Sequence, residues 1–240
     1  MSKLTMAVVL GLMAGQVLAD GSASDEREWP RASVGVGLAA PLQVPYTDSD
    51  VVGFRFGGLF GWSRLVKGCD IGLAELTGGD LTGFQLSGVS WTEGDIVGCQ
   101  VSCLANVAFG VTEGFQAGAV NAVWGDVYGF QLGAVNYDAE FFGMQVAALA
   151  NWNTLESRAF QIGLVNANQG EFTGVSLGAV NYAETFTGFA CGVVNEAYKA
   201  TGVQLGVFNA CDEMRGIQIG LVNLIGDEKL AILPIANFSF

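Results

Sequence analysis

The chain has 240 residues, of which 51% are hydrophobic and 14% are charged, and this composition excludes an intrinsically disordered protein. With 35 Gly and only 4 Pro, it also disfavours collagen and a helical bundle. Ten basic and 23 acidic residues give a formal net charge of −13, which argues against nucleic-acid binding. The chain contains no His, so Ser–His and Cys–His catalytic pairs and His-bearing zinc sites are excluded.

The first residues read as an export signal. Lys3 precedes an apolar run that ends at Leu18, and Val17-Leu18-Ala19 has the small residues of a cleavage site. A buried N-terminal helix is the alternative interpretation, which the short run disfavours. We therefore expect residues 1–19 to be a signal peptide and residues 20–31 to be a polar lead-in.

An internal repeat fills most of the remaining chain. Its unit is Gly-Φ-Gln-Φ-Gly-Φ-Val-Asn, where Φ is apolar, followed by six or seven variable residues. We number the unit from position one, the first Gly, to position eight, the Asn. Position one of successive copies is occupied by Gly53, Gly68, Gly83, Gly98, Gly114, Gly129, Gly143, Ala159, Gly174, Gly188, Gly202 and Gly216. A degenerate copy starts at Leu230.

The columns of the repeat indicate β-strands. Positions two, four and six are apolar and alternate with Gly, Gln and Gly, and a period of two is typical of a strand. Residues 32–41 alternate in the same way and could add a strand. We predict one β-repeat domain over residues 32–240, with repeats from residue 53 and a terminal strand at 230–240.

The sequence favours an all-β, antiparallel outer-membrane-type barrel. Thirteen repeats of 14–16 residues and one further strand give about 14 strands, and bacterial barrels have an even number. Strands of about ten residues, tilted in a barrel, span about 24 Å, which is close to a membrane's apolar band. The apolar columns would face lipid, whereas the Gly and Gln columns would line the lumen.

The alternative architecture is a parallel β-solenoid with 14–15 residues per coil. Its support is the uniform shortness of the connections and the ladders that stacked Asn and Gln residues would form. A straight strand of ten residues leaves only four or five residues for the return. The coil therefore closes only if the strand bends at a Gly corner.

The last residues favour the barrel. Phe238 and the terminal Phe240 resemble the end of an outer-membrane barrel, which the barrel-assembly machinery reads. Phe238 and Phe240 are thus expected to form an assembly signal, with that machinery and outer membrane lipid as partners. The expected location is the cell outer membrane, with the cell surface or secretion as the alternative.

The repeat also resembles a known family. GFQLGAVN at 129–136 and GIQIGLVN at 216–223, with LPIANFSF at 233–240, are similar to the bacterial surface-repeat family first noted in leptospiral surface proteins. The resemblance implies a surface protein and transfers no activity. The early copies depart from the pattern, with Arg55 and Asp70 in the Gln column and Phe60, Glu75, Ser90 and Ala105 in the Asn column.

The Gln column is the main candidate for chemistry. In a barrel it would either line a wet passage or form a structural amide ladder, and the half-apolar lumen favours the ladder. Ser176, within Gly-Val-Ser-Leu-Gly, merely occupies this column and lacks a His partner, so it does not indicate a hydrolase. The candidate residues are Gln85, Gln100, Gln116, Gln131, Gln145, Gln161, Gln204 and Gln218.

These features predict a non-enzymatic outer-membrane or surface repeat protein with a structural role or a narrow pore. The alternative is a soluble or surface-attached β-solenoid that acts as an adhesion or scaffolding module. We expect no catalytic residues, no metal, no cofactor and no nucleic acid, and the sequence names no surface ligand.

Overall fold

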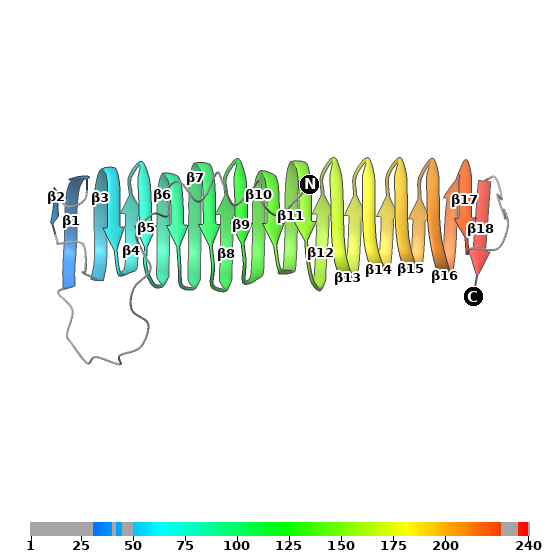
Figure 1. The fold of residues 1–240 in the computed structure, drawn as a ribbon, viewed down its shortest axis with the longest axis horizontal. Coiled ribbons are helices and arrows are strands. Elements are labelled where there is room, and N and C mark those ends of the chain that lie inside the picture. Colours follow the sequence, from blue (N-terminus) through cyan, green and yellow to red (C-terminus); the bar gives the residue numbers. More distant parts are fainter. Residues whose placement is uncertain (1–30, 40–41, 45–49, 227–234, 240) are drawn as a thin grey trace, which may run out of the picture.

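The computed structural model describes residues 31–39, 42–44, 50–226 and 235–239. It is a parallel β-solenoid of about twelve turns, in which the chain winds into a straight stack of coils (Figure 1). The strands are β1 (Arg31–Ala39), β2 (Leu42–Val44), β3 (Asp50–Ser63), β4 (Leu65–Ile71), β5 (Ala74–Thr77), β6 (Leu81–Thr92), β7 (Ile96–Ala108), β8 (Thr112–Ala117), β9 (Val120–Val123), β10 (Asp126–Asp138), β11 (Glu140–Asn153), β12 (Ser157–Ile162), β13 (Val165–Leu177), β14 (Val180–Cys191), β15 (Val194–Leu205), β16 (Phe208–Gly220), β17 (Val222–Ile225) and β18 (Ile235–Ser239).

The predicted antiparallel barrel is therefore wrong, and so is the prediction of transmembrane β-strands. Each repeat pairs in parallel with the next in the described chain, as β10 does with β11, and Gly129 lies opposite Gly143. Alternation with a period of two is common to both architectures, so it could not separate them. The structure is instead the parallel β-solenoid that the repeat also allows.

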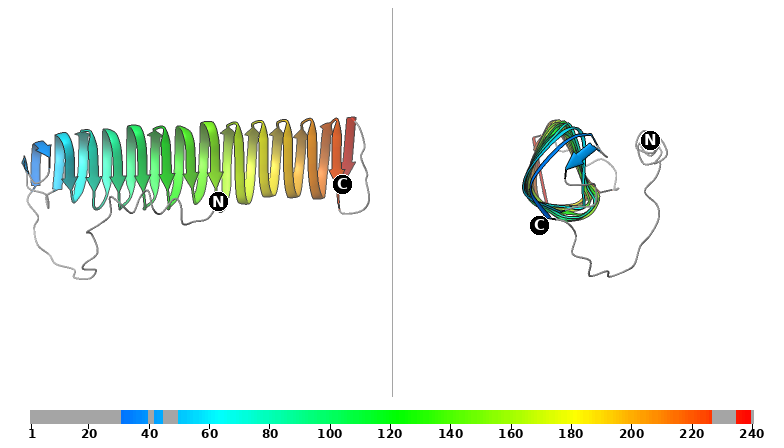
Figure 2. Two further views of the ribbon diagram at one scale, coloured as in Figure 1. Left: turned by 45° about the horizontal axis from the view of Figure 1, so that its top comes forward. Right: turned by 90° about the vertical axis from the view of Figure 1, so that its left-hand side faces the viewer.

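The coil closes because the strand bends within the repeat. The chain bends at positions five and six, for example at Gly178 and Ala179, and a second strand segment begins at position seven. Seen end-on, the coils superpose into one rounded outline (Figure 2). The condition for closing a short coil, a bend at a Gly corner, is thus met. We call positions four to seven the corner.

The register corrects two positions of the sequence alignment. Gly61 lies opposite Glu75, and Asn106 lies opposite Ser90. Gly61 and Asn106, and not Phe60 and Ala105, therefore stand in the Asn column. These two copies, and the copy that starts at Gly143, carry one extra residue at the corner. Positions eight and beyond in these copies are therefore named by their register with the neighbouring coil.

Glycine at position one is required by the backbone. Gly129 has a φ of 147°, and a Cβ atom there would collide with the carbonyl oxygen of Gly114 in the preceding coil. The other glycines at position one have positive φ values as well. Ala159 takes this place in one copy, and its φ is not positive. The first Gly of the unit thus allows each coil to lie close against its neighbour.

The interior has a polar and an apolar zone. The polar zone contains positions three and eight, where the Gln and Asn side chains are buried. The apolar zone is built by the residues two places before position one, together with position ten. It contains Val51, Val66, Leu81, Ile96, Val127, Phe141, Phe172, Phe186 and Met214 with Ala108, Val123, Ala183, Ala197 and Cys211.

Antiparallel strands are found in the described chain only at the two ends of the stack. β2 pairs antiparallel with β1 at the first end, and β18 pairs antiparallel with β16 at the last end. A parallel stack leaves an open strand edge at each end, which could pair with another chain. The reversed strands interrupt the in-register stack at both ends and so act against end-to-end association.

Candidate functional site

The Asn column forms a continuous ladder through the interior. From Asn106 to Asn209, Nδ2 of each Asn donates to Oδ1 of the Asn in the next coil, as in Asn151 to Asn166 at 2.8 Å. The same nitrogen donates to a backbone carbonyl at position four, as in Asn151 to Ile162 at 3.0 Å. The members are Asn106, Asn121, Asn136, Asn151, Asn166, Asn181, Asn195, Asn209 and Asn223. Each Asn therefore links two coils and holds the corner between them.

The Gln column forms a second ladder. Nε2 of Gln100 donates to Oε1 of Gln85 at 2.8 Å, and the same contact repeats from coil to coil as far as Gln161. Ser176 and Ala190 then interrupt the ladder, and Gln218 to Gln204 resumes it at 2.8 Å. All eight candidate glutamines are buried in the coil interior. The structure has no barrel lumen for them to line.

The two ladders point in opposite directions. Asn amides donate towards the C-terminal end of the stack, whereas Gln amides donate towards the N-terminal end. Aligned amides polarise one another, and a single long ladder would sum its dipoles. Because the two ladders point in opposite directions, their dipoles offset each other in the coil interior.

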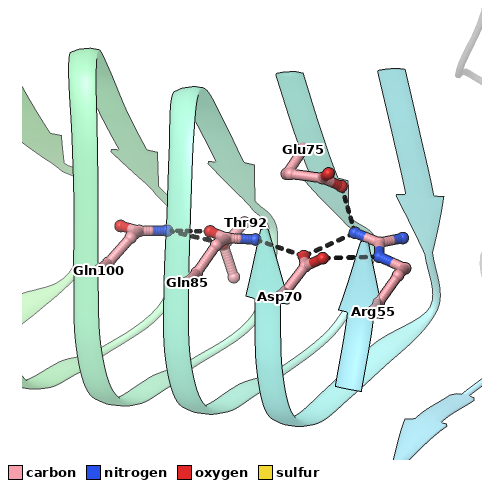
Figure 3. A network of polar contacts seen from close by, with 6 residues as sticks. All are labelled: Arg55, Asp70, Glu75, Gln85, Thr92 and Gln100. Carbon is pink, nitrogen blue, oxygen red and sulfur yellow. Dashed lines mark hydrogen bonds and ion pairs between the residues drawn. The ribbon is translucent and has the colours of Figure 1, made fainter. Parts of the chain in front are cut away.

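A buried charged cluster ends the Gln ladder at its N-terminal side. Gln85 Nε2 donates to Asp70 Oδ2 at 3.0 Å, and Arg55 Nε donates to Asp70 Oδ1 at 2.7 Å (Figure 3). Arg55 also forms an ion pair with Glu75. A carboxylate can only accept hydrogen bonds, so Asp70 fixes which end of Gln85 faces it and thereby the direction of the ladder.

The cluster holds a carboxyl group that titrates near neutral pH. Burial, with the nearby charge of Asp70, raises the pKa of Glu75 to about 7, although Arg55 opposes the shift. The carboxyl group fits beside Gly57, Gly61 and Gly72, where a Cβ atom would occupy its place. With Glu75 protonated, Arg55 and Asp70 balance each other, so the buried cluster is neutral.

Asp138 is a second buried carboxyl group, at position ten. It accepts hydrogen bonds from Gln131 Nε2 at 2.7 Å and Gln145 Nε2 at 2.6 Å. Burial raises its pKa well above the usual value, and these two hydrogen bonds only oppose the shift. The folded state therefore holds this proton more tightly than the unfolded state does.

We expect Asp138→Asn to stabilise the protein at pH 8 and to leave its stability at pH 4 nearly unchanged. Because the folded pKa is raised, the stability of the natural chain falls as pH rises from the unfolded value of about 4 towards the folded pKa. Asn resembles the protonated carboxyl group and stands in the same column at Asn153. Urea-unfolding midpoints at the two pH values would check this, and an equal midpoint for both proteins at pH 8 would contradict it.

The outer surface is apolar along the corner. Across all twelve copies, positions four to seven contain no charged residue, and the polar Ser87 and Ser102 in these segments are buried. The projecting side chains are 47–70% exposed and form what we call the corner ridge: Leu59, Leu73, Leu104, Leu149, Leu164, Val193, Val207 and Leu221. Monomeric proteins rarely expose a contiguous apolar patch of this length.

Aromatic residues border the ridge at position nine. Tyr137, Trp152 and Tyr182 point outward there and are partly or largely exposed. In the neighbouring coils Phe109 stacks on Trp124 with ring centroids 5.0 Å apart, and Trp91 lies 4.9 Å from Phe109. The Gln and Asn side chains of the repeat point inward, so the surface that another molecule could contact is formed by the outward-facing apolar columns.

The described residues offer little room for a bound substrate inside the coil. A small, partly open hollow lined by residues that include Asn168, Phe172 and Gln204 has a volume of about 10 Å³, the space of a single water molecule. In the same part of the chain, no group of three His, Cys, Asp or Glu side chains is placed to hold a metal ion. The described residues include no helix that is long and apolar enough to cross a membrane.

Of the two expected assembly residues, the structure describes only Phe238. Phe238 lies in β18 and is 67% exposed, opposite Ile217 of β16. Phe240, the expected signal peptide at 1–19 and most of the expected lead-in lie outside the described residues. Comparison with protein families, curated proteins and solved structures gave no match to this chain.

Proposed function

We propose that the chain is an exported, non-enzymatic β-solenoid that acts as a surface-attached adhesion or scaffolding module. The observation that carries the proposal is the division of the repeat, with polar side chains bonded to one another inside and uninterrupted apolar columns outside. The narrow pore that the sequence suggested requires a barrel, and the solenoid fold does not support it.

Three further features support this proposal. The stack is long and regular, so it can present the same surface many times along its axis. The buried side-chain ladders tie each coil to the next and make the stack stiff. Residues 1–19 have the pattern of a signal peptide, which would bring the chain out of the cytoplasm.

The experiment is display of the full chain on bacterial cells. We expect the mature chain to lack residues 1–19 by mass spectrometry and to be cleaved by protease added outside intact cells. Such cells should attach to polystyrene beads more than cells that express a chain without residues 1–19. Retention in the cytoplasm, or attachment equal to that of the control cells, would overturn the proposal.

A further inference from the structure

We propose that the corner ridge inserts into the acyl-chain layer of a lipid membrane, so that the solenoid lies along the membrane surface. The inference depends on the proposed function only for bringing the chain to a membrane. Lipid is the occupant of the ridge, and the solenoid binds the membrane peripherally by one edge of the stack.

The backbone at the corner is already satisfied within the protein. The N–H of Val193 donates to the carbonyl of Ala179 at 2.9 Å, and the N–H of Gly192 donates to the carbonyl of Leu205 at 2.9 Å. Asn195 Nδ2 adds a bond to the same Leu205 carbonyl at 3.0 Å. Hydrocarbon offers no hydrogen bonds, so backbone can contact it only when its polar groups are paired internally. The Asn ladder helps to meet this requirement coil after coil.

The charge pattern selects lipid of a particular kind. The corner has no charged residue in any copy, whereas the whole chain carries −13. An anionic membrane surface would repel the acidic chain. Burial of the ridge by 5–10 Å, the depth of interfacial apolar faces, needs no charge attraction. The occupant is therefore a zwitterionic or neutral lipid layer.

The convex shape argues against a second copy on the ridge. Twelve coils spaced at about 4.8 Å make a ridge about 53 Å long. Two rigid ridges would touch along a strip about one side chain wide and bury only about 600 Å² in total, whereas stable interfaces bury at least about 1,000 Å². Fluid acyl chains can surround a convex ridge on both sides, so lipid covers more of its apolar surface.

The aromatic residues beside the ridge fit the same placement. Trp152 and Tyr182 stand two residues beyond position seven on the outer surface and are about 40% exposed. Tyr and Trp prefer the boundary between acyl chains and water, where the ring is apolar and its polar atom is wet. With the ridge inserted, these rings would lie at the level of the headgroups.

The test uses the purified chain without residues 1–19 and phosphatidylcholine vesicles. Co-flotation should be strong for the natural chain, and should fall at least about tenfold for Leu149→Gln, Leu164→Gln and Leu221→Gln combined, because three exposed leucines leave the lipid. The matched control combines Val97→Gln, Leu155→Gln and Tyr198→Gln, which replace exposed apolar residues away from the corner. The control should float like the natural chain, and adding phosphatidylglycerol should not strengthen binding.

A second measurement needs no variant. Brominated acyl chains should quench the tryptophan fluorescence of the natural chain, because Trp152 lies beside the ridge. The proposal is overturned if the natural chain stays free of vesicles, or if control and ridge variants lose binding equally. A natural chain that is dimeric in buffer and a ridge variant that is monomeric would instead make the ridge an interface between copies. Because purified protein is used, a failure of export leaves this test unaffected.

Discussion

Replacing Gly129 with alanine is expected to lower the free energy of unfolding of the central coils by about 3 kcal/mol. Gly129 has a φ of 147°, which is unfavourable for any residue with a Cβ atom. The added Cβ would also meet the carbonyl oxygen of Gly114, which is backbone and cannot move without separating two coils. Hydrogen exchange should therefore accelerate first on both sides of this position.

The matched control is Ala159→Gly. Ala159 holds position one of its own copy without a positive φ, so glycine there removes a methyl group and adds chain flexibility, at a cost of about 0.5–1 kcal/mol. Protection of residues near 159 should remain close to that of the natural chain. Equal losses in the two variants would show that the backbone conformation at Gly129 is not the cause.

The sequence predicted the local structure well and the global arrangement poorly. Alternation in segments such as Phe130, Gln131 and Leu132 correctly indicated strands, with apolar and amide columns on opposite faces. The alternation says nothing about whether neighbouring strands are parallel or antiparallel, because the side chains alternate in both. The length of the connections was the more informative signal, since a barrel usually has longer loops at one end.

The sequence indicated only that a short coil would need a bend at a Gly corner in order to close. Gly133 and its equivalents occupy position five, and at Gly118, Gly163 and Gly178 a bend interrupts the strand. A Cβ atom at Gly133 would meet the side-chain oxygen of Asn136, so this glycine leaves room for the Asn ladder. Such a packing requirement joins residues of neighbouring coils, and a single sequence does not reveal it before the register is known.

The charged cluster shows what the sequence could not give. Arg55, Asp70 and Glu75 depart from the repeat in the sequence, but their spacing does not indicate that they are in contact. Their contact depends on the parallel register, which places Arg55 opposite Asp70 and Gly61 opposite Glu75. In an antiparallel barrel these side chains would have had other neighbours. The charges of these three residues pair with one another only in the register of the solenoid.

The second large effect is expected for Arg55→Ala. The substitution leaves Asp70 and Glu75 buried without their cation, and the loss of one partner of a buried ion pair typically costs about 3–5 kcal/mol. The loss should be largest at pH 8 and smaller at pH 5, where protonation can neutralise Glu75, whose pKa is already raised to about 7. Because coils contact only their neighbours, the effect should be confined to the first coils.

Hydrogen exchange of residues 50–92, with residues 160–220 as an internal reference, would measure this effect. The control is the combined Arg55→Gln, Asp70→Gln and Glu75→Asn variant, which places in these columns the residues found at Gln131, Gln145 and Asn136. Replacement of a complete buried charge cluster by well-fitting neutral groups is often neutral or stabilising. The neutral variant should thus be at least as protected as the natural chain and lose its pH dependence. The neutral variant leaves no buried charge without a partner. If both variants are equally destabilised at pH 8, the loss of stability in Arg55→Ala is therefore not caused by unpaired buried charges.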